Sequence, residues 1–224
     1  VSELVPIKKD SEAEYLCFVT KKGLIKRVKI QDFDYIPRKG KIAITLKDDD
    51  ELCSVKATSG EDEIIIAGSN GKAVRFDENE VRVMGRTASG VHGFNTDGST
   101  VVGVATSTEG KYLLAVSENG YGKRTEIDEY RKTSRGTKGV KTMNITSKTG
   151  SLINVRAVNG DEDVMIVTDG GIIIRISLDN VGVYGRNTQG VKLINVNENE
   201  TVSKVAIVDK NEDESSDVLS EPQA

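Results

Sequence analysis

The chain has 224 residues, 37% of them hydrophobic and 4% aromatic, with no tryptophan and a formal net charge of −4. Few aromatic side chains argue against a sugar-binding or base-stacking surface, and no apolar run is long enough to span a membrane. The sequence starts at Val1 without methionine or a signal peptide, so we expect a segment of a larger cytoplasmic protein. In that compartment Cys17 and Cys53 are expected to be reduced.

The negative charge is concentrated at the C-terminal end of the chain. Residues 209–224 contain six acidic residues and one lysine, which leaves 30 basic and 29 acidic residues in 1–208. The few apolar residues of this segment predict a disordered acidic tail. We hypothesise that Asp209–Asp217 competes with a polyanion for basic surface elsewhere in the chain, because the two are tethered together. A purely solubilising tail is the alternative.

Four hairpin turns ending in glycine recur along residues 1–208. They are separated by 48, 49 and 51 residues, and their glycines are Gly23, Gly71, Gly120 and Gly171. A repeat of this length without a 3.6-residue apolar period is typical of propeller blades. The sequence therefore predicts one all-β domain over 1–208, propeller-like and built from four-stranded repeats. The repeats lie near residues 15–57, 63–105, 112–158 and 164–208.

Each repeat is predicted to contain four strands in the same order. The first strands are Tyr15–Thr20, Glu63–Gly68, Tyr112–Ser117 and Val164–Thr168. The second strands follow the turn glycine and are Leu24–Ile30, Lys72–Phe76, Gly122–Glu126 and Ile172–Ser177. The third are Ile42–Leu46, Val91–Phe94, Val140–Ile145 and Val191–Val196, and the fourth are Leu52–Ala57, Val101–Ala105, Leu152–Val158 and Val202–Val208. Residues Val1–Ile7 resemble a fourth strand and predict one extra strand.

Two arginines recur at fixed places in every repeat. The first lies four residues after the turn glycine, at Arg27, Arg75, Arg124 and Arg175. The second lies fifteen residues after it, in or beside a glycine-rich loop, at Arg38, Arg86, Arg135 and Arg186. Glycines let backbone amides and a guanidinium approach a phosphate together. The pattern therefore favours a scaffold that presents arginines to a polyanion.

Other interpretations of these residues remain open. The first arginines are also suited to pair with acids on the next strand, above all Arg175, which lies among isoleucines. The only histidine, His92, has no partner with which to form a zinc site or a catalytic triad. The acidic run 48–51 lacks the spacing of a calcium loop. We therefore expect no catalysis, no metal and no cofactor in this segment.

Two segments carry a resemblance to a known family. Asn119-Gly120-Tyr121-Gly122-Lys123-Arg124-Thr125 and Gly185-Arg186-Asn187-Thr188-Gln189-Gly190-Val191 resemble the C-terminal domain of the gyrase A protein, part of DNA gyrase. The resemblance covers Val1–Val208. It implies a six-bladed β-pinwheel in which neighbouring blades exchange strands and duplex DNA wraps around the outer rim. Because this chain has four repeats and the family has six blades, the resemblance implies that two blades lie outside this chain.

The resemblance also implies a cellular role. Such domains make the strand passage of gyrase directional, so that a holoenzyme using ATP and Mg²⁺ introduces negative supercoils. The implied partners are the rest of gyrase A and the gyrase B protein, in the bacterial cytoplasm at the nucleoid. We expect the isolated domain to be a monomer. The alternatives are the C-terminal domain of topoisomerase IV and a propeller-type protein-interaction scaffold that does not bind DNA.

One departure from the family pattern concerns its basic box, a glutamine, two arginines and a glycine-lysine-glycine run. This box is absent, and Arg38-Lys39-Gly40-Lys41 matches it only in part. The first and third turns have the most basic surroundings, which favours DNA contacts in those repeats. The predicted DNA-binding residues are Lys26, Arg27, Arg38, Lys39, Lys41, Arg75, Arg86, Lys123, Arg124, Arg131, Lys132, Arg135, Lys138 and Arg186.

Overall fold

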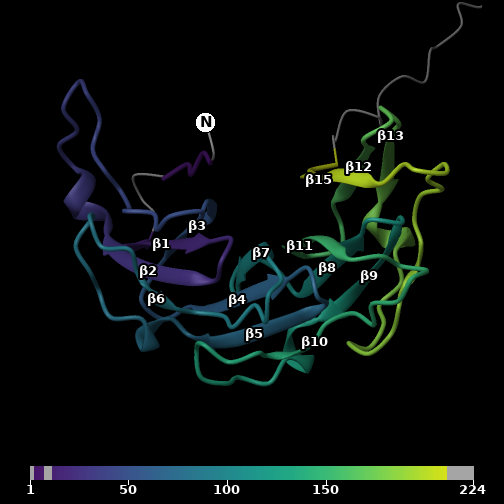
Figure 1. Cartoon of the computed structure of the whole chain (residues 1–224), viewed down its shortest axis with the longest axis horizontal. Helices are drawn as coiled ribbons and strands as arrows, with labels where there is room; N and C mark the ends of the chain where they lie inside the picture. The colour runs from purple at the N-terminus through teal and green to yellow at the C-terminus, as the bar shows by residue number, and fades with distance from the viewer. Residues whose placement is uncertain (1–2, 8–11, 211–224) are drawn as a thin grey trace, which may run out of the picture.

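The structure is a computed structural model, and it describes residues 3–7 and 12–210. Four antiparallel sheets follow one another around an arc that is open on one side (Figure 1). We call them blades 1 to 4 in chain order. This arrangement confirms the predicted all-β, pinwheel-like fold. The tail predicted for 209–224 lies outside the described residues from 211 onward, and at its start Lys210 pairs with Asp179.

Three long strands form each blade, and the first of them is always central. Blade 1 contains β1 (Tyr15–Thr20), β2 (Leu24–Lys29) and β3 (Leu52–Thr58). Blade 2 contains β4 (Glu63–Gly68), β5 (Lys72–Asp77) and β7 (Val101–Thr106). Blade 3 contains β8 (Tyr112–Ser117), β9 (Tyr121–Glu126) and β11 (Leu152–Val158). Blade 4 contains β12 (Asp163–Thr168), β13 (Ile173–Ser177) and β15 (Val202–Val208).

The outermost strand of blades 1 to 3 comes from the following repeat. It is β6 (Val91–His92) on β2, β10 (Val140–Lys141) on β5 and β14 (Val191–Lys192) on β9. The exchange of strands between neighbouring blades is thereby confirmed. Gly23 shows why the turn needs glycine: its φ is 83°, and the amides of Gly93 and Phe94 both donate to its carbonyl oxygen. A Cβ atom here would overlap the carbonyl oxygen of Phe94.

Two sequence predictions about strands were wrong. The third segments were predicted as strands of four to six residues, but the three that pair contribute only two residues each. Residues 42–46 do not form a strand. In the other repeats this segment pairs with the blade before its own, and the described residues include no blade before blade 1. Residues 3–7 do not form a strand either. A fourth strand pairs with the first strand of its own repeat, and the described residues contain no first strand before β1. Val5 instead packs against the blade 1 cluster of Leu16 and Phe18.

A short 3₁₀ turn follows the second long strand of every blade. The turns are η1 (Ile30–Phe33), η2 (Glu78–Glu80), η3 (Ile127–Glu129) and η4 (Leu178–Asn180). Each turn leads into a loop on the outer side of the arc, which we call the rim loop of that blade. Rim loops 2, 3 and 4 are residues 85–90, 134–139 and 185–190. Within the described ranges, no helix is long and apolar enough to cross a bilayer.

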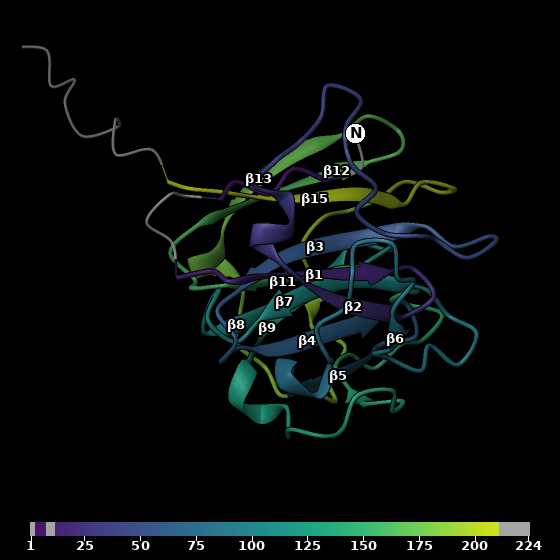
Figure 2. The ribbon, with the colours of Figure 1, turned by 90° about the vertical axis from the view of Figure 1, so that its left-hand side faces the viewer.

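The hydrophobic core consists of layers between successive sheets, which are stacked face to face (Figure 2). Strand β4 illustrates the consequence for sequence. Ile64 and Ile66 pack toward blade 1, while Ile65 and Ala67 pack toward blade 3. A strand buried on both faces is apolar at consecutive positions rather than at alternate ones. The continuous apolar first strands therefore follow from the stacking.

Gly103 on β7 tests how tightly the blades are stacked. A Cβ at this position would overlap the carbonyl oxygen of Val155 on β11. We expect Gly103→Ala to destabilise the protein by about 1–3 kcal/mol, because strands of neighbouring blades must separate. Gly85→Ala, where nothing lies within 4 Å and φ is not positive, serves as the control and should change stability by less than about 0.5 kcal/mol. Urea unfolding measures both, and equal effects would contradict tight stacking.

Candidate nucleic-acid interface

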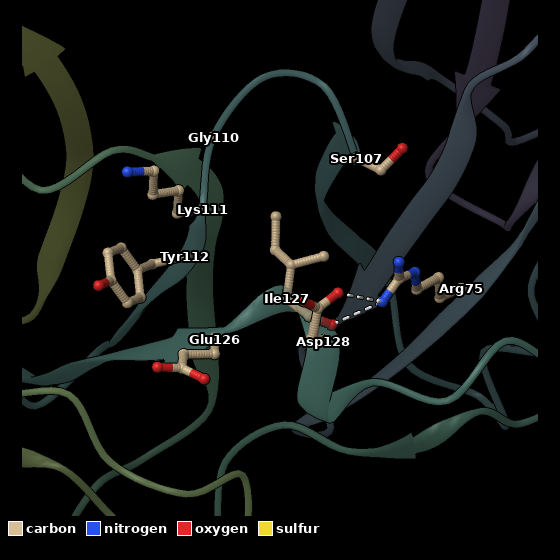
Figure 3. A pocket seen from close by; sticks show the side chains of 8 residues that line it. All are labelled: Arg75, Ser107, Gly110, Lys111, Tyr112, Glu126, Ile127 and Asp128. Carbon is tan, nitrogen blue, oxygen red and sulfur yellow. Dashed lines mark hydrogen bonds and ion pairs between the residues drawn. The ribbon is translucent and has the colours of Figure 1, made fainter.

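The first repeated arginine reaches from its own blade to the 3₁₀ turn of the next one. Nη1 of Arg75 donates to the carbonyl oxygens of Ile127 and Tyr130, at 2.8 and 3.2 Å. The same nitrogen lies 3.5 Å from the carboxylate of Asp128. This contact lies beside a pocket of about 360 Å³ lined by residues of blades 2 and 3. Figure 3 shows the lining side chains. The guanidinium of Arg75 therefore joins two blades.

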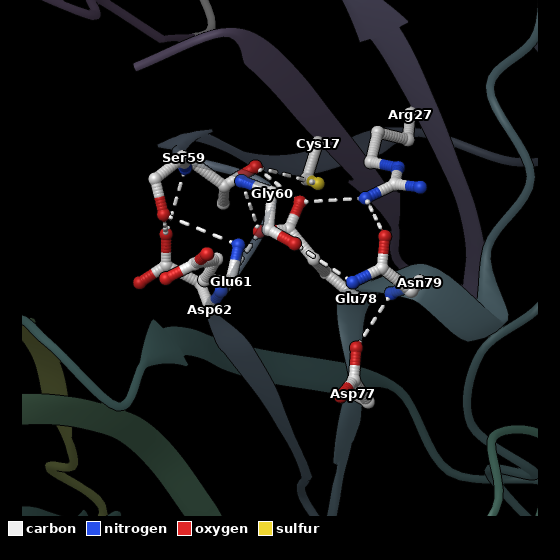
Figure 4. Close-up of polar contacts among 10 residues, drawn as sticks. Cys17, Arg27, Ser59, Gly60, Glu61, Asp62, Asp77, Glu78 and Asn79 are labelled. Atoms are coloured by element: carbon white, nitrogen blue, oxygen red, sulfur yellow. Dashed lines mark hydrogen bonds and ion pairs between the residues drawn. The ribbon is translucent and has the colours of Figure 1, made fainter. Parts of the chain in front are cut away.

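Arg27 makes the corresponding contact between blades 1 and 2 with a fully buried carboxylate (Figure 4). Its Nη1 donates to Oε2 of Glu78 at 3.1 Å. The hydroxyl of Thr58 and the amides of Gly60 and Asp62 also donate to Glu78, at 2.7, 2.7 and 2.9 Å. Such a carboxylate is tolerated in the interior because donors surround it. The pair holds η2 against blade 1.

The same arginine position also has a partner at the start of the central strand of its own blade. In blades 1 and 3 the partner is a tyrosine ring, with the guanidinium 4.6 and 5.2 Å from the ring centroid. In blades 2 and 4 it is a carboxylate. The pairs are Arg27 with Tyr15, Arg75 with Glu63, Arg124 with Tyr112 and Arg175 with Asp163. Arg175 does pair with an acid, but the acid lies on the preceding strand β12 rather than on the next strand, where the sequence prediction put it. The three arginines that the sequence assigned to DNA also have structural partners.

The structure also corrects the sequence prediction for Lys26 and Lys123. Both side chains are fully buried, so neither can touch a ligand at the surface. Each ammonium instead donates to carbonyl oxygens of the next rim loop, for example to Gly85 at 3.2 Å and to Gly185 at 2.6 Å. Burial is the main cause that lowers the pKa of both lysines to about 8, and the charge of a nearby loop arginine contributes to this shift.

The loop arginines bind the preceding blade while part of each side chain stays accessible. Nη1 of Arg86, Arg135 and Arg186 donates to the carbonyl oxygen of Ile42, His92 and Lys141, respectively, at 3.1, 2.9 and 3.0 Å. In two loops the backbone amide of the arginine also donates to an acid, Glu80 for Arg135 and Glu129 for Arg186. These bonds fix the rim loops against the preceding blade.

The remaining predicted residues lie at the surface of the outer side. Arg38, Lys39 and Arg131 are exposed and make no hydrogen bond within the described residues. Lys41 is half-buried and donates to the carbonyl oxygen of Asp32 at 3.0 Å. Two exposed lysines form ion pairs, Lys132 with Glu63 at 2.5 Å and Lys138 with Asp97 at 2.9 Å. Such exposed pairs are weak, so these amines can exchange partners.

The exposed basic residues that sequence reasoning missed include Arg82, Lys141 and Lys192. Lys141 and Lys192 lie on the exchanged strands β10 and β14. Arg82 precedes rim loop 2 by the same distance as Arg131 precedes rim loop 3. The signal was present in the spacing, because Arg82 and Arg131 each lie four residues before a loop arginine. Across 3–7 and 12–210, no cluster of three histidine, cysteine or acidic residues could hold a metal ion.

Comparison with family models finds one match over most of the chain. The model is described as the DNA gyrase C-terminal domain, beta-propeller, and it matches residues 14–59, 62–108, 111–159 and 162–209. The gyrase A protein of Ureaplasma parvum serovar 3 is 49% identical over 193 residues, 86% of this chain and 23% of that protein. The gyrase A protein of Staphylococcus epidermidis is 43% identical over 217 residues, 95% of this chain and 24% of that protein.

Solved structures show the same fold. A DNA gyrase A C-terminal domain matches with a TM-score of 0.78 and 29% identity, covering 90% of this chain and 68% of that one. The C-terminal domain of DNA topoisomerase IV matches with a TM-score of 0.82 and 24% identity, covering 92% and 65%. The chain spans about a quarter of the length of the curated gyrase A relatives that it matches.

The two environments of the first arginine predict different mutational costs. Arg27→Met removes one partner of a buried ion pair, which typically costs about 3–5 kcal/mol because the other charge stays buried. Arg175→Met, at the same repeat position, removes an exposed pair and should cost about 0–1 kcal/mol. Chemical denaturation compares the two variants. Equal losses would show that the contact with Glu78 does not hold blades 1 and 2 together.

The lowered pKa of Lys123 predicts a dependence of stability on pH. Between its folded pKa of about 8 and the ordinary lysine pKa of 10.5, the unfolded chain retains a proton that the folded chain has released. This group therefore makes the folded state more stable as the pH rises through that window, and penalises it below pH 8. Lys123→Met lacks the effect, so wild-type stability minus variant stability should increase as the pH rises from about 8 toward 10. A constant difference in urea unfolding would contradict the buried ammonium.

Proposed function

The chain belongs to the DNA gyrase C-terminal domain family, and we propose that it binds duplex DNA along its outer rim and bends it. One observation carries the proposal. Exposed basic residues recur at matching places of consecutive blades, Arg82 with Arg131 and Lys141 with Lys192. Regularly spaced cations on a convex edge are suited to successive phosphates, which give affinity without sequence preference.

The proposed bending requires contacts along an extended surface rather than at a single patch. Curving a site of 20–30 base pairs by 40–90° costs about 1–6 kcal/mol, which the contacts must repay. Blade 1 offers Arg38 and Lys39, and blade 3 offers Arg131, Lys132 and Lys138. We therefore keep the proposal that contacts concentrate in blades 1 and 3. The fixed rim loops favour binding because little ordering is left to be done.

The wider role is also a proposal, supported by 43–49% identity to gyrase A proteins. That identity favours gyrase over topoisomerase IV. In this proposal the domain directs strand passage toward negative supercoiling, as part of an assembly with the rest of gyrase A and gyrase B at the bacterial nucleoid. The ATP and Mg²⁺ of such a holoenzyme would act outside this segment, which would itself need no cofactor.

The rim proposal predicts a result for paired charge variants. Lys141→Gln/Lys192→Gln removes two rim cations, whereas Arg156→Gln/Lys204→Gln removes two exposed cations from the inner strands β11 and β15. Binding of a fluorescent duplex is measured over a series of salt concentrations. Each lost phosphate contact should reduce the slope of log K against log salt by about 0.9. We expect a clear reduction for the rim variant and none for the inner one.

Two further outcomes bear on the proposal. Energy transfer between dyes at the duplex ends reports bending, and the distance should shorten on binding. Equal weakening by both variants would mean that affinity comes from net charge rather than from the rim. Failure of the unmodified chain to bind duplex at low salt would contradict the function and favour a protein-interaction scaffold.

A further inference from the structure

The buried lysines lie in cages of oxygen atoms contributed largely by the next blade. Nζ of Lys26 lies within hydrogen-bonding distance of four carbonyl oxygens, those of Ala43 at 2.7 Å, Gly85 at 3.2 Å, Ala88 at 3.1 Å and Arg86, which share its three N–H groups. No carboxylate bonds to this ammonium in the described part of the chain. An unpaired buried charge is expensive, so its retention calls for a reason beyond packing.

Lys123 repeats the arrangement two blades later. Its Nζ donates to the carbonyl oxygens of Gly185 at 2.6 Å and Arg186 at 2.9 Å, and to the hydroxyl of Thr188 at 3.1 Å. Glu129 lies near enough to favour the charged form, but it bonds to the amide of Arg186. Rim loops 2 and 4 are therefore each assembled over a cation of the preceding blade.

While loop carbonyls bond to the lysine, several backbone amides of the same loops have no acceptor in the part of the chain that the structure describes. The amides of Thr87 and Ser89 in rim loop 2, and of Asn187 and Gln189 in rim loop 4, donate to no protein acceptor among the described residues. These four residues are exposed or half-buried. Free backbone amides beside a local positive charge are suited to bind an anion. The guanidinium of the loop arginine lies in the same loop.

Rim loop 3 provides an internal comparison because it has no buried lysine. The position equivalent to Lys26 and Lys123 in blade 2 is Val74. The amide equivalent to those of Thr87 and Asn187 belongs to Gly136, and it donates to the carbonyl oxygen of Gly93 at 2.6 Å. At this one place the free amide accompanies the buried lysine and is lost without it, whereas the amide of Lys138, equivalent to those of Ser89 and Gln189, has no acceptor among the described residues either.

We propose that rim loops 2 and 4 are phosphate sites, each organised by the buried ammonium of the preceding blade, which acts as a positioning residue. The inference rests on the proposed DNA binding and names where backbone phosphates of the duplex are held. It places these sites in alternate blades, with rim loop 3 relying on side chains such as Lys138 and Arg131. Inorganic phosphate shares the chemistry, so the experiment uses both ligands.

The test follows backbone amide signals of the whole chain by NMR during titration with a short duplex and, separately, with inorganic phosphate. We expect shifts at Thr87, Ser89, Asn187 and Gln189, and none at Gly136. Lys123→Met keeps the length of the side chain and removes its charge. It should abolish the response of rim loop 4 while rim loop 2, held by Lys26, responds as before. The unchanged response of rim loop 2 shows that the Lys123→Met variant is folded.

A pH series gives a second readout that does not require a variant. Lys26 faces the guanidinium of Arg86, and Lys123 faces Arg186 and Glu129. Since burial lowers the pKa of both lysines to about 8, raising the pH from about one unit below that value to about one unit above it should weaken duplex binding while the chain stays folded. In Lys26→Met/Lys123→Met the loss should disappear, and the salt slope at neutral pH should fall by about 0.9 per phosphate lost.

The outcomes separate this inference from the proposed function. If Lys123→Met leaves the response of rim loop 4 intact, the lysine does not organise the site and the inference is wrong. It is also wrong if the loops respond to inorganic phosphate but not to the duplex. In both cases, weakening by Lys141→Gln/Lys192→Gln would leave the DNA-binding rim standing. Absence of any duplex binding would instead contradict the function itself.

Discussion

The structure depends on contacts between successive blades, because no sheet of blades 1 to 3 is complete within its own repeat. Each takes its outermost strand from the following repeat, as β10 does on β5. The faces of a central strand such as β4 are buried by two different neighbours. In such an array the interface between repeats carries much of the stability. The rim loops are hydrogen-bonded across the same interfaces, so their geometry depends on how the blades are joined.

One repeated position shows how context decides the role of a residue. The guanidinium of Arg27 is enclosed by a tyrosine ring and a buried carboxylate of the next blade, whereas Arg175 pairs with Asp163 on its own sheet and stays exposed. The four arginines have the same register but different surroundings. Arginine suits this position because a planar guanidinium can stack on a ring and donate at its edge at once.

Sequence predicted what is local: the turn glycines, the long strands and their order. The strand exchange came only from the family resemblance, because a two-residue strand such as β10 has no periodicity to detect. The sequence also did not reveal that the side chains of Lys26 and Arg27 are buried. In a sheet with one solvated face, adjacent residues would place one cation in water, but stacking covers both faces. Lys141 was missed because it lies on a segment expected to pack.

Charged side chains fix the rim loops of this nearly neutral domain before any ligand binds. Glu78 holds Arg27 in the interior, while the exposed Glu80 and Glu129 accept the backbone amides of two loop arginines. The buried cations fix the loops, which leaves other cations free at the surface. A loop fixed before binding loses little conformational entropy when it meets a phosphate, so more of each contact remains to offset the stiffness of the duplex. The contacts between blades that make the rim loops rigid therefore also help the domain to bend the duplex.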